Sequence, residues 1–202
     1  MAAPIDFYFD FSSPYGYFAS TRIDGLAAKY GREVAWRPIL LGAAMKITGG
    51  TPLPSVPLKG EYAKRDFARS ASFYGAEYRL PSTFPISSQA PARAFYWLTL
   101  RDPNQAKALA AALYRAYFVD DINISNPEDT IVVCVKFGLN AEEVRTALND
   151  PAIKELVKSE VDKAIGRGAF GSPYIVIDGE AFWGADRLQQ IERWLASGGW
   201  KY

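Results

Sequence analysis

The sequence of 202 residues contains no histidine and only one cysteine, Cys134. Without histidine, neither a Ser-His-Asp triad nor a Cys-His pair can form, and a zinc site of the usual His/Cys kind is excluded. A single cysteine also excludes an intramolecular disulfide and a thiol–disulfide cycle on the chain's own sulfurs. Any reactivity must therefore rest on hydroxyls, carboxylates, amines, backbone dipoles or a bound molecule.

The sequence also lacks an excess of charge and a long apolar run. Lys and Arg number 23 and Asp and Glu number 22, so no basic field exists that would attract a nucleic-acid backbone. No apolar stretch approaches the roughly 20 residues that span a bilayer. The first ten residues have no basic start, and Asp6 and Asp10 interrupt their apolar run, which is unlike a signal peptide. We therefore expect a cytoplasmic protein that binds neither nucleic acid nor a membrane.

The N-terminal stretch FYFDFSSPYGYFAS predicts a strand that runs directly into a helix. Residues 5–11 alternate between apolar and polar, as in a strand with one buried face. Ser13 then has the position of an N-cap and Pro14 that of the first helical residue. Apolar residues at helical spacing continue this helix to Gly31. Residues 33–39 predict a second strand, and the β-α-β order favours a parallel crossover.

The central part of the sequence is predicted to be largely helical. Residues 42–60 are rich in Gly and Pro, which indicates a loop or a short helix beside a binding surface. From about residue 61 to 165 the pattern is helical. Residues 126–138 are ambiguous because their β-branched run favours a strand. An N-cap at Asn126 and the closing Gly138 favour a helix, which we adopt, with Cys134 in its apolar core.

Strand signals return near the C-terminus. Residues 172–178 form a buried run, and Asp178-Gly179 predicts a hairpin turn into residues 180–183. Asp186 with Gln189 predicts an N-cap and capping box for a last helix. This order predicts an α/β, thioredoxin-like fold (β-α-β … β-β-α) interrupted by a large all-helical insertion. Its domains would be residues 1–41 with 166–202, and the insertion 42–165.

Three segments carry a resemblance to a known family. FDFSSPYGYFA, VPLKGEY and GAFGSPYIVIDGEAFWGADRL, in this order, resemble the 2-hydroxychromene-2-carboxylate isomerases. That family belongs to a group that also holds the kappa-class glutathione transferases and the DsbA-like oxidoreductases. The resemblance covers nearly the whole chain, and the segments are specific in combination although each alone is weak. It implies glutathione as cofactor, a small aromatic keto acid as substrate, a role in aromatic degradation and a homodimer.

The resemblance also assigns residues. The catalytic serine falls on Ser13, and a cis-proline loop falls on Ser172 and Pro173. The segment that binds the γ-glutamyl end of glutathione comprises Trp183, Gly184, Ala185 and Asp186. Of the two lysines near the site, Lys59 is assigned to glutathione and Lys46 to the substrate, and Phe84 is an aromatic of the substrate pocket. No metal ligand is implied. One departure is Gly50, which replaces the asparagine of the family pattern Gly-Asn-Thr-Pro-Pro that would hydrogen-bond glutathione or the substrate.

Bound glutathione would supply the sulfur that the chain lacks where the first predicted strand meets the helix that begins at Pro14. A free thiol has a pKa of about 8.5, and both the Ser13 hydroxyl and the helix N-terminus would favour its thiolate. Each assigned residue also has a purely structural explanation. Ser13 and Asp186 are ordinary caps, a proline commonly opens a strand, and Lys46 and Lys59 are ordinary surface charges.

Three functions follow from these residues. The first is a glutathione-dependent isomerase that forms an o-hydroxybenzylidenepyruvate from 2-hydroxychromene-2-carboxylate by reversible thiolate addition. The second is a kappa-like transferase or peroxidase that consumes glutathione. The third is a non-enzymatic, DsbA-like peptide-binding protein.

Overall fold

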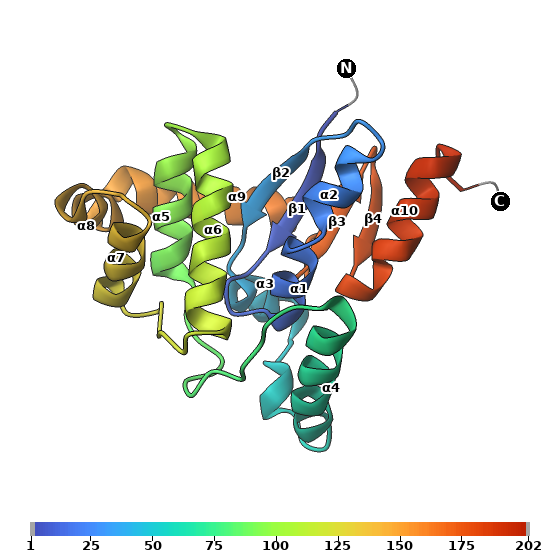
Figure 1. Cartoon of the computed structure of the whole chain (residues 1–202), viewed down its shortest axis with the longest axis horizontal. Helices are drawn as coiled ribbons and strands as arrows, with labels where there is room; N and C mark the ends of the chain where they lie inside the picture. The colour runs from blue at the N-terminus through green and yellow to red at the C-terminus, as the bar shows by residue number, and fades with distance from the viewer. Residues whose placement is uncertain (1–2, 201–202) are drawn as a thin grey trace.

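The structure is a computed structural model that describes residues 3–200. A four-stranded mixed sheet lies at the centre of the molecule (Figure 1). The strands are β1 (Ile5–Phe9), β2 (Val34–Pro38), β3 (Tyr174–Ile177) and β4 (Glu180–Trp183), in the order β2-β1-β3-β4. β2 runs parallel to β1, whereas β3 is antiparallel to both β1 and β4. The parallel crossover is thus confirmed. The hairpin is confirmed as well, because Asp178 and Gly179 have φ values of 51° and 93°, as a type I′ turn requires.

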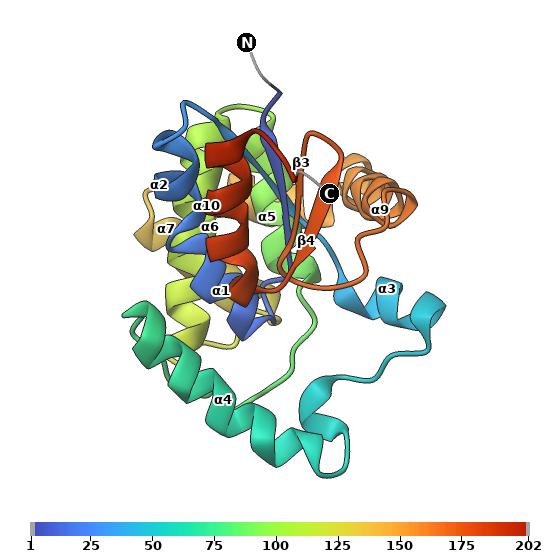
Figure 2. The ribbon, with the colours of Figure 1, turned by 90° about the vertical axis from the view of Figure 1, so that its right-hand side faces the viewer.

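Helices cover both faces of this sheet. Figure 2 shows α1 (Pro14–Ser20), α2 (Ile23–Ala28) and α10 (Leu188–Ser197) on one side and α9 (Pro151–Gly166) on the other. The expectation of a single buried face for residues 5–11 is therefore wrong. Tyr8 is 2% exposed and packs in a cluster with Ile39 of the following loop and Ala164 of α9. A strand covered on both faces is usual where a helical crossover returns over a sheet.

The predicted N-terminal helix is interrupted. α1 ends at Ser20 and α2 begins at Ile23. At the break, the Ser20 hydroxyl donates to the Tyr17 carbonyl and the Thr21 hydroxyl donates to the Phe18 carbonyl. Such side-chain bonds compete with the helical ladder and bend or end it. The helix that follows Ser13 therefore has seven residues.

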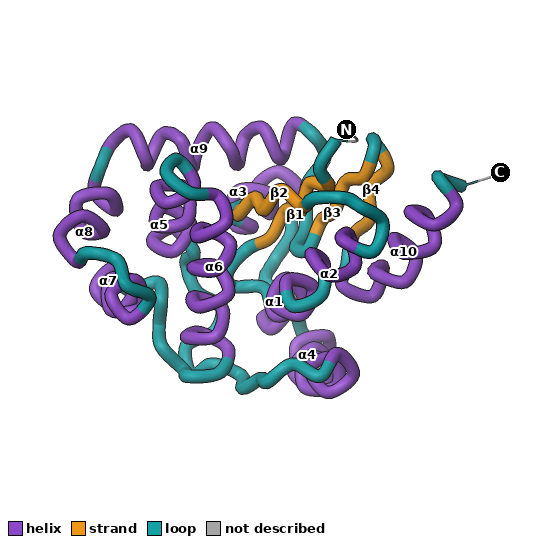
Figure 3. The backbone as a smooth tube through the Cα atoms, turned by 45° about the horizontal axis from the view of Figure 1, so that its top comes forward, coloured by secondary structure: helices purple, strands orange, loops and turns teal. Residues whose placement is uncertain are grey.

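The region between β2 and β3 is helical, as predicted. Its elements are α3 (Leu41–Thr48), the 3-10 turn η1 (Leu53–Ser55), α4 (Lys59–Tyr74), α5 (Gln89–Thr99), α6 (Pro103–Phe118), α7 (Pro127–Lys136), α8 (Ala141–Asn149) and α9. The ambiguous segment is the helix α7, and the Asn126 side chain accepts a hydrogen bond from the Glu128 N–H at 3.0 Å. Figure 3 shows how α9 leads from α8 back to the sheet.

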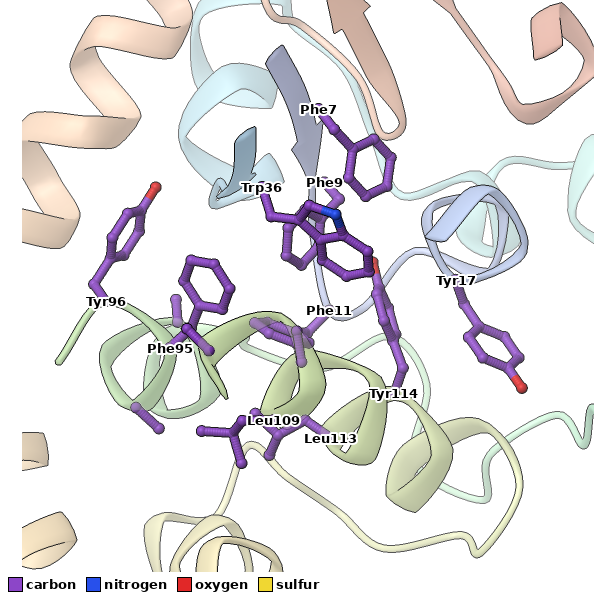
Figure 4. Close-up of a cluster of buried hydrophobic side chains, with 14 of the residues drawn as sticks. Phe7, Phe9, Phe11, Tyr17, Trp36, Phe95, Tyr96, Leu109, Leu113 and Tyr114 are labelled. Atoms are coloured by element: carbon purple, nitrogen blue, oxygen red, sulfur yellow. The ribbon is translucent and has the colours of Figure 1, made fainter. Parts of the chain in front are cut away.

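The sheet and the helical region share one hydrophobic core. Phe7 and Phe9 of β1 pack against Trp36 of β2, and Phe9 also contacts Phe95 of α5 and Tyr114 of α6, with ring centroids 6.0 and 5.7 Å apart (Figure 4). The division into domains at residues 42 and 165 stays a prediction. Within residues 3–200, the helices are all too short or too polar to cross a membrane.

Candidate active site

Ser13 lies at the junction of β1 and α1 and is 6% exposed. Its Oγ accepts a hydrogen bond from the Gly16 N–H at 3.0 Å, which makes it the N-cap of α1. Its hydroxyl proton is donated to the carbonyl oxygen of Ser172, 2.9 Å away. Ser13 therefore caps the helix with an oxygen lone pair and donates the proton of the same hydroxyl to a residue that lies 159 positions further along the chain.

The loop that carries Ser172 faces this junction. The Ser172–Pro173 peptide bond is cis, and the Ser172 main chain contacts Ser13, so both features agree with the sequence prediction. The Ser172 Oγ accepts a hydrogen bond from the Asp10 N–H at 2.8 Å. The end of β1 is thus bonded to the proline loop through two serines.

Asp10 is a buried member of the site that the sequence analysis missed. Its side chain is 3% exposed, and its carboxylate accepts hydrogen bonds from the N–H groups of Ser12 and Leu41, each at 2.7 Å. Burial raises the pKa of this carboxyl above its ordinary value, although these hydrogen bonds oppose the shift. Leu40, the N-cap residue of α3, makes no side-chain cap, so Asp10 satisfies the first N–H of that helix from a distance.

The alternation of residues 5–11 predicts that Asp10 lies on a polar, exposed face of the strand. In the structure, α9 and the loop after β2 cover this face. A local signal did exist. An aspartate two residues before Ser12 can bond the Ser12 N–H in an Asx turn, and this bond is present. The contact with Leu41 depends on the tertiary fold.

A cavity of about 550 Å³ opens beside Ser172. Its lining residues come from α1, α4, the proline loop, β4 and the turn between β4 and α10. Its lining residues are Tyr15, Asp66, Arg69, Ser70, Phe73, Tyr74, Ser172, Trp183, Gly184, Ala185, Asp186 and Arg187. Two carboxylates and two guanidinium groups face one small space, a charge pattern that suits a zwitterionic ligand.

The four residues predicted to hold the γ-glutamyl end of glutathione all line this cavity. Trp183 is 57% exposed, and its indole lies directly against Gly171, where a Cβ atom would collide with the ring. Glycine at this position therefore allows the indole to approach the backbone just before Ser172 and Pro173. This contact places the aromatic ring beside the proline loop.

The structural role predicted for Asp186 is wrong. α10 begins after Arg187, without a side-chain cap, and Asp186 lies in the 3-10 turn η2 (Ala185–Arg187). The capping box with Gln189 is absent because this turn satisfies the nearby backbone donors, including a bond from the Arg187 N–H to the Gly184 carbonyl at 3.2 Å. The Asp186 carboxylate is 71% exposed and pairs with Arg187 at 3.8 Å, so it remains accessible from the cavity.

The cavity lining does not include the predicted residues Ser13, Pro173, Lys46, Lys59 and Phe84. Lys46 on α3 and Lys59 at the start of α4 are exposed. Phe84 is half-buried and packs edge to face against Phe67, with ring centroids 5.8 Å apart. Its segment reaches the junction nonetheless, because the Ile86 N–H donates to the Ser12 Oγ at 3.0 Å. The roles of Lys46, Lys59 and Phe84 stay predictions.

Tyr15 and Asp66 form a second contact that the sequence analysis missed. The Tyr15 hydroxyl donates to Oδ2 of Asp66 at 2.6 Å, and Arg69 donates to Oδ1 at 3.0 Å. Tyr15 and Asp66 are 51 residues apart, and no local pattern links them. Among residues 3–200, the acidic side chains and Cys134 form no group of three or more that could hold a metal ion.

The four-stranded mixed sheet, the helical region between β2 and β3 and the cis-proline that faces the first helix are the features of a thioredoxin-fold protein of the DsbA class. Residues 4–196 match the model of the DSBA-like thioredoxin domain. The chain is 32% identical over 198 residues to the 2-hydroxychromene-2-carboxylate isomerase of Sphingobium xenophagum, covering 96% of this chain and 99% of the relative. The chain therefore belongs to the DsbA-like thioredoxin family and, within it, to the family of the 2-hydroxychromene-2-carboxylate isomerases.

Two further comparisons agree with this assignment. A solved structure of a 2-hydroxychromene-2-carboxylate isomerase has a TM-score of 0.86 and 29% identity, and the match covers 97% of this chain and 95% of that one. The glutathione S-transferase kappa 2 of Caenorhabditis elegans is 26% identical, over 95% of this chain and 91% of the relative. The family resemblance, the fold and the prediction of an isomerase-like enzyme are thus confirmed.

Proposed function

We propose that the protein is a glutathione-dependent isomerase of 2-hydroxychromene-2-carboxylate, or of a close aromatic keto acid, with an o-hydroxybenzylidenepyruvate as product. The observation that carries this proposal is the Ser13 hydroxyl, held between the Gly16 N–H and the carbonyl of Ser172, a residue that lines a charged cavity. The relatives named as isomerases support the reaction class.

The donor set of the cavity fits glutathione. The γ-glutamyl end of glutathione carries an ammonium and a carboxylate, and the cavity offers Asp66 and Asp186 for the first and Arg69 and Arg187 for the second. The main chain of Ser172 can pair with the peptide backbone of the ligand as an added strand does. When bound, glutathione supplies a thiolate that adds reversibly to the conjugated system, so that the former double bond can rotate.

The Ser13 hydroxyl can stabilise a thiolate by reorienting its proton. In the structure this proton is directed at the Ser172 carbonyl. Turning it toward a sulfur anion replaces a neutral hydrogen bond by a charge-assisted one, which is roughly twice as strong. The Ser172 carbonyl then becomes available to an N–H of the ligand. The bond from the Gly16 N–H uses a lone pair of Ser13 and can persist throughout.

The dipole of α1 stabilises a bound thiolate less than the dipole of a long helix would, because α1 has only seven residues. A helix terminus stabilises a nearby anion by about 0.3–1 kcal/mol when it is exposed and by up to ~2 kcal/mol when it is partly buried. The Ser13 hydroxyl is therefore the main stabilising group in this proposal. Lys59 for glutathione, and Lys46 and Phe84 for the substrate, remain proposals.

The isomerase is tested by counting turnovers per glutathione. Thoroughly dialysed protein should be nearly inactive, because the junction has no cysteine of its own. With limiting glutathione and excess 2-hydroxychromene-2-carboxylate, the protein should complete many turnovers per glutathione, and free thiol titrated before and after should be unchanged. Thiol loss in proportion to product would instead identify a kappa-like transferase or peroxidase, the second candidate, which the kappa relatives favour.

Titration calorimetry separates both enzymes from a DsbA-like peptide-binding protein. A dissociation constant for glutathione below the millimolar range is expected of either enzyme, and its absence would favour the peptide-binding protein. A homodimer, a cytoplasmic location and a role in aromatic degradation belong to the same proposal. Sedimentation of the purified chain tests the dimer directly.

A further inference from the structure

Tyr15 connects the catalytic junction to the far wall of the cavity. It is the second residue of α1, and its ring packs against Phe67 of α4 and Phe18 of α1, with centroids 5.3 and 6.4 Å apart. Both of these contacts are edge to face, which is a favoured geometry for aromatic pairs. The ring is therefore held by α1 and α4 before its hydroxyl reaches Asp66.

Asp66 is less firmly held by its other partners. Arg69 bonds it at 3.0 Å, but the Arg69 side chain is 62% exposed, and exposed ion pairs restrain geometry weakly. The Ser70 hydroxyl lies at 3.5 Å, at the limit of a hydrogen bond. The short bond from Tyr15 is thus the firmest contact of this carboxylate. Burial and this bond raise the pKa of Tyr15, which keeps the phenol protonated as a donor.

A carboxylate has about four acceptor positions. Tyr15 and Ser70 approach Oδ2, and Arg69 approaches Oδ1. At least one position therefore remains for a donor of a ligand in the cavity that Asp66 lines. Its fixed negative charge suits an ammonium donor.

We infer that Tyr15 is a positioning residue that orients Asp66 toward the α-amino group of glutathione. The inference rests on the proposed function and assigns to Tyr15 a role in cofactor affinity, separate from the thiolate chemistry of Ser13. Fixing a side chain before binding lowers the ordering cost at the moment of binding. Tyr15→Phe keeps the ring and removes only the hydroxyl.

The experiment measures the dissociation constants of two ligands by titration calorimetry. One is glutathione, and the other is glutaryl-cysteinylglycine, which lacks the α-amino group. Tyr15→Phe should weaken glutathione binding about threefold to tenfold and leave the amine-free ligand unchanged. Asp66→Asn should reduce the preference for glutathione to the part that Asp186 supplies, and Tyr15→Phe should add nothing in that background, as expected when one residue acts through the other.

Tyr17→Phe is the matched control. Its hydroxyl also joins α1 to the chain beyond α4, through the Glu77 carbonyl at 2.9 Å, but Tyr17 lies outside the cavity lining. This variant should bind both ligands as the wild type does. The thiol pKa of bound glutathione should be the same in Tyr15→Phe as in the wild type, since Ser13 is untouched.

Three results with the Tyr15→Phe variant would overturn the inference. Tyr15→Phe could weaken both ligands equally, it could weaken glutathione further in the Asp66→Asn background, or it could change neither affinity. A wild type that binds the two ligands equally well would refute the role of Asp66 and Tyr15 and leave the proposed function standing. A wild type that binds neither ligand would refute both proposals.

Discussion

Replacing Ser13 by alanine separates its two structural duties from its proposed chemistry. The loss of the bond to the Gly16 N–H removes a helix cap, which costs about 1 kcal/mol of unfolding free energy. The Ser172 carbonyl, in a residue that is 8% exposed, loses its donor as well, at a cost of about 1 kcal/mol more. We therefore expect a folded variant that is about 2 kcal/mol less stable than the wild type.

Ser13→Ala should also raise the pKa of the bound glutathione thiol, an effect that the loss of folding stability does not explain. A hydrogen bond to a charged group contributes about 1.5–3 kcal/mol, and one pKa unit corresponds to about 1.4 kcal/mol. The pKa of the bound thiol should therefore rise by about one to two units, toward the free value of about 8.5. Near neutral pH the thiolate fraction and the turnover rate should fall roughly tenfold, and much of this loss should disappear near pH 9.

The matched control is Asn126→Ala. Asn126 also caps a helix that begins with proline, and it accepts the Glu128 N–H at 3.0 Å, but it lies on α7, away from the junction. It should lose about 1 kcal/mol of stability without a change in turnover. The assays are urea unfolding, the ultraviolet absorbance of the bound thiolate against pH, and the pH profile of kcat. Equal turnover in Ser13→Ala and Asn126→Ala would show that Ser13 is only a cap.

Three further predictions follow from packing and burial. Gly16→Ala should gain helix propensity but lose stability overall by about 1–3 kcal/mol, since the new Cβ would lie 2.7 Å from the Ser172 Oγ and 2.8 Å from the Tyr114 hydroxyl; a more stable variant in urea unfolding would contradict this. Burial raises the pKa of Asp10 in the native state above the ordinary value of 3.8, so at pH values just above 3.8 the native state binds more protons than the unfolded state. The contribution of Asp10 to the unfolding free energy therefore decreases as the pH rises through the native pKa. Asp10→Asn should remove this pH dependence of stability, and an unchanged pH dependence would refute the assignment. Burial raises the pKa of Cys134 to about 12, so native protein should resist thiol reagents that modify it after unfolding, and Cys134→Ala should retain full turnover.

The sequence was sufficient where structure depends on neighbouring residues. The cap at Ser13, the helix after Asn126 and the turn at Asp178-Gly179 each follow from the side chain or backbone preference of a few adjacent residues. The break after Ser20 was not predicted, because apolar spacing alone does not report the hydroxyl bonds that end α1.

Long-range contacts explain what the sequence left out of the site. Asp10 reaches Leu41, and Tyr15 reaches Asp66, across 31 and 51 residues. The period of β1 gave Asp10 a polar face, and the packing of α9 and of the segment after β2 against β1 made that face part of the interior. Phe84 packs on Phe67 outside the lining of the cavity, and its place in a substrate pocket stays a prediction.

The buried polar groups of the chain support the location of the candidate active site without reference to related proteins. Within residues 3–200, the polar side chains classed as buried are Asp10, Ser13, Ser88, Thr130 and Ser172. Asp10, Ser13 and Ser172 belong to the junction, since the Asp10 N–H donates to the Ser172 Oγ and the Ser13 hydroxyl donates to the Ser172 carbonyl. Burying such groups costs free energy that apolar side chains would not. Elsewhere in the core, the buried polar atoms include tyrosine hydroxyls, such as those of Tyr96 and Tyr117, each of which donates to a backbone carbonyl. Polar groups concentrated at one junction, against that cost, are expected where they perform chemistry.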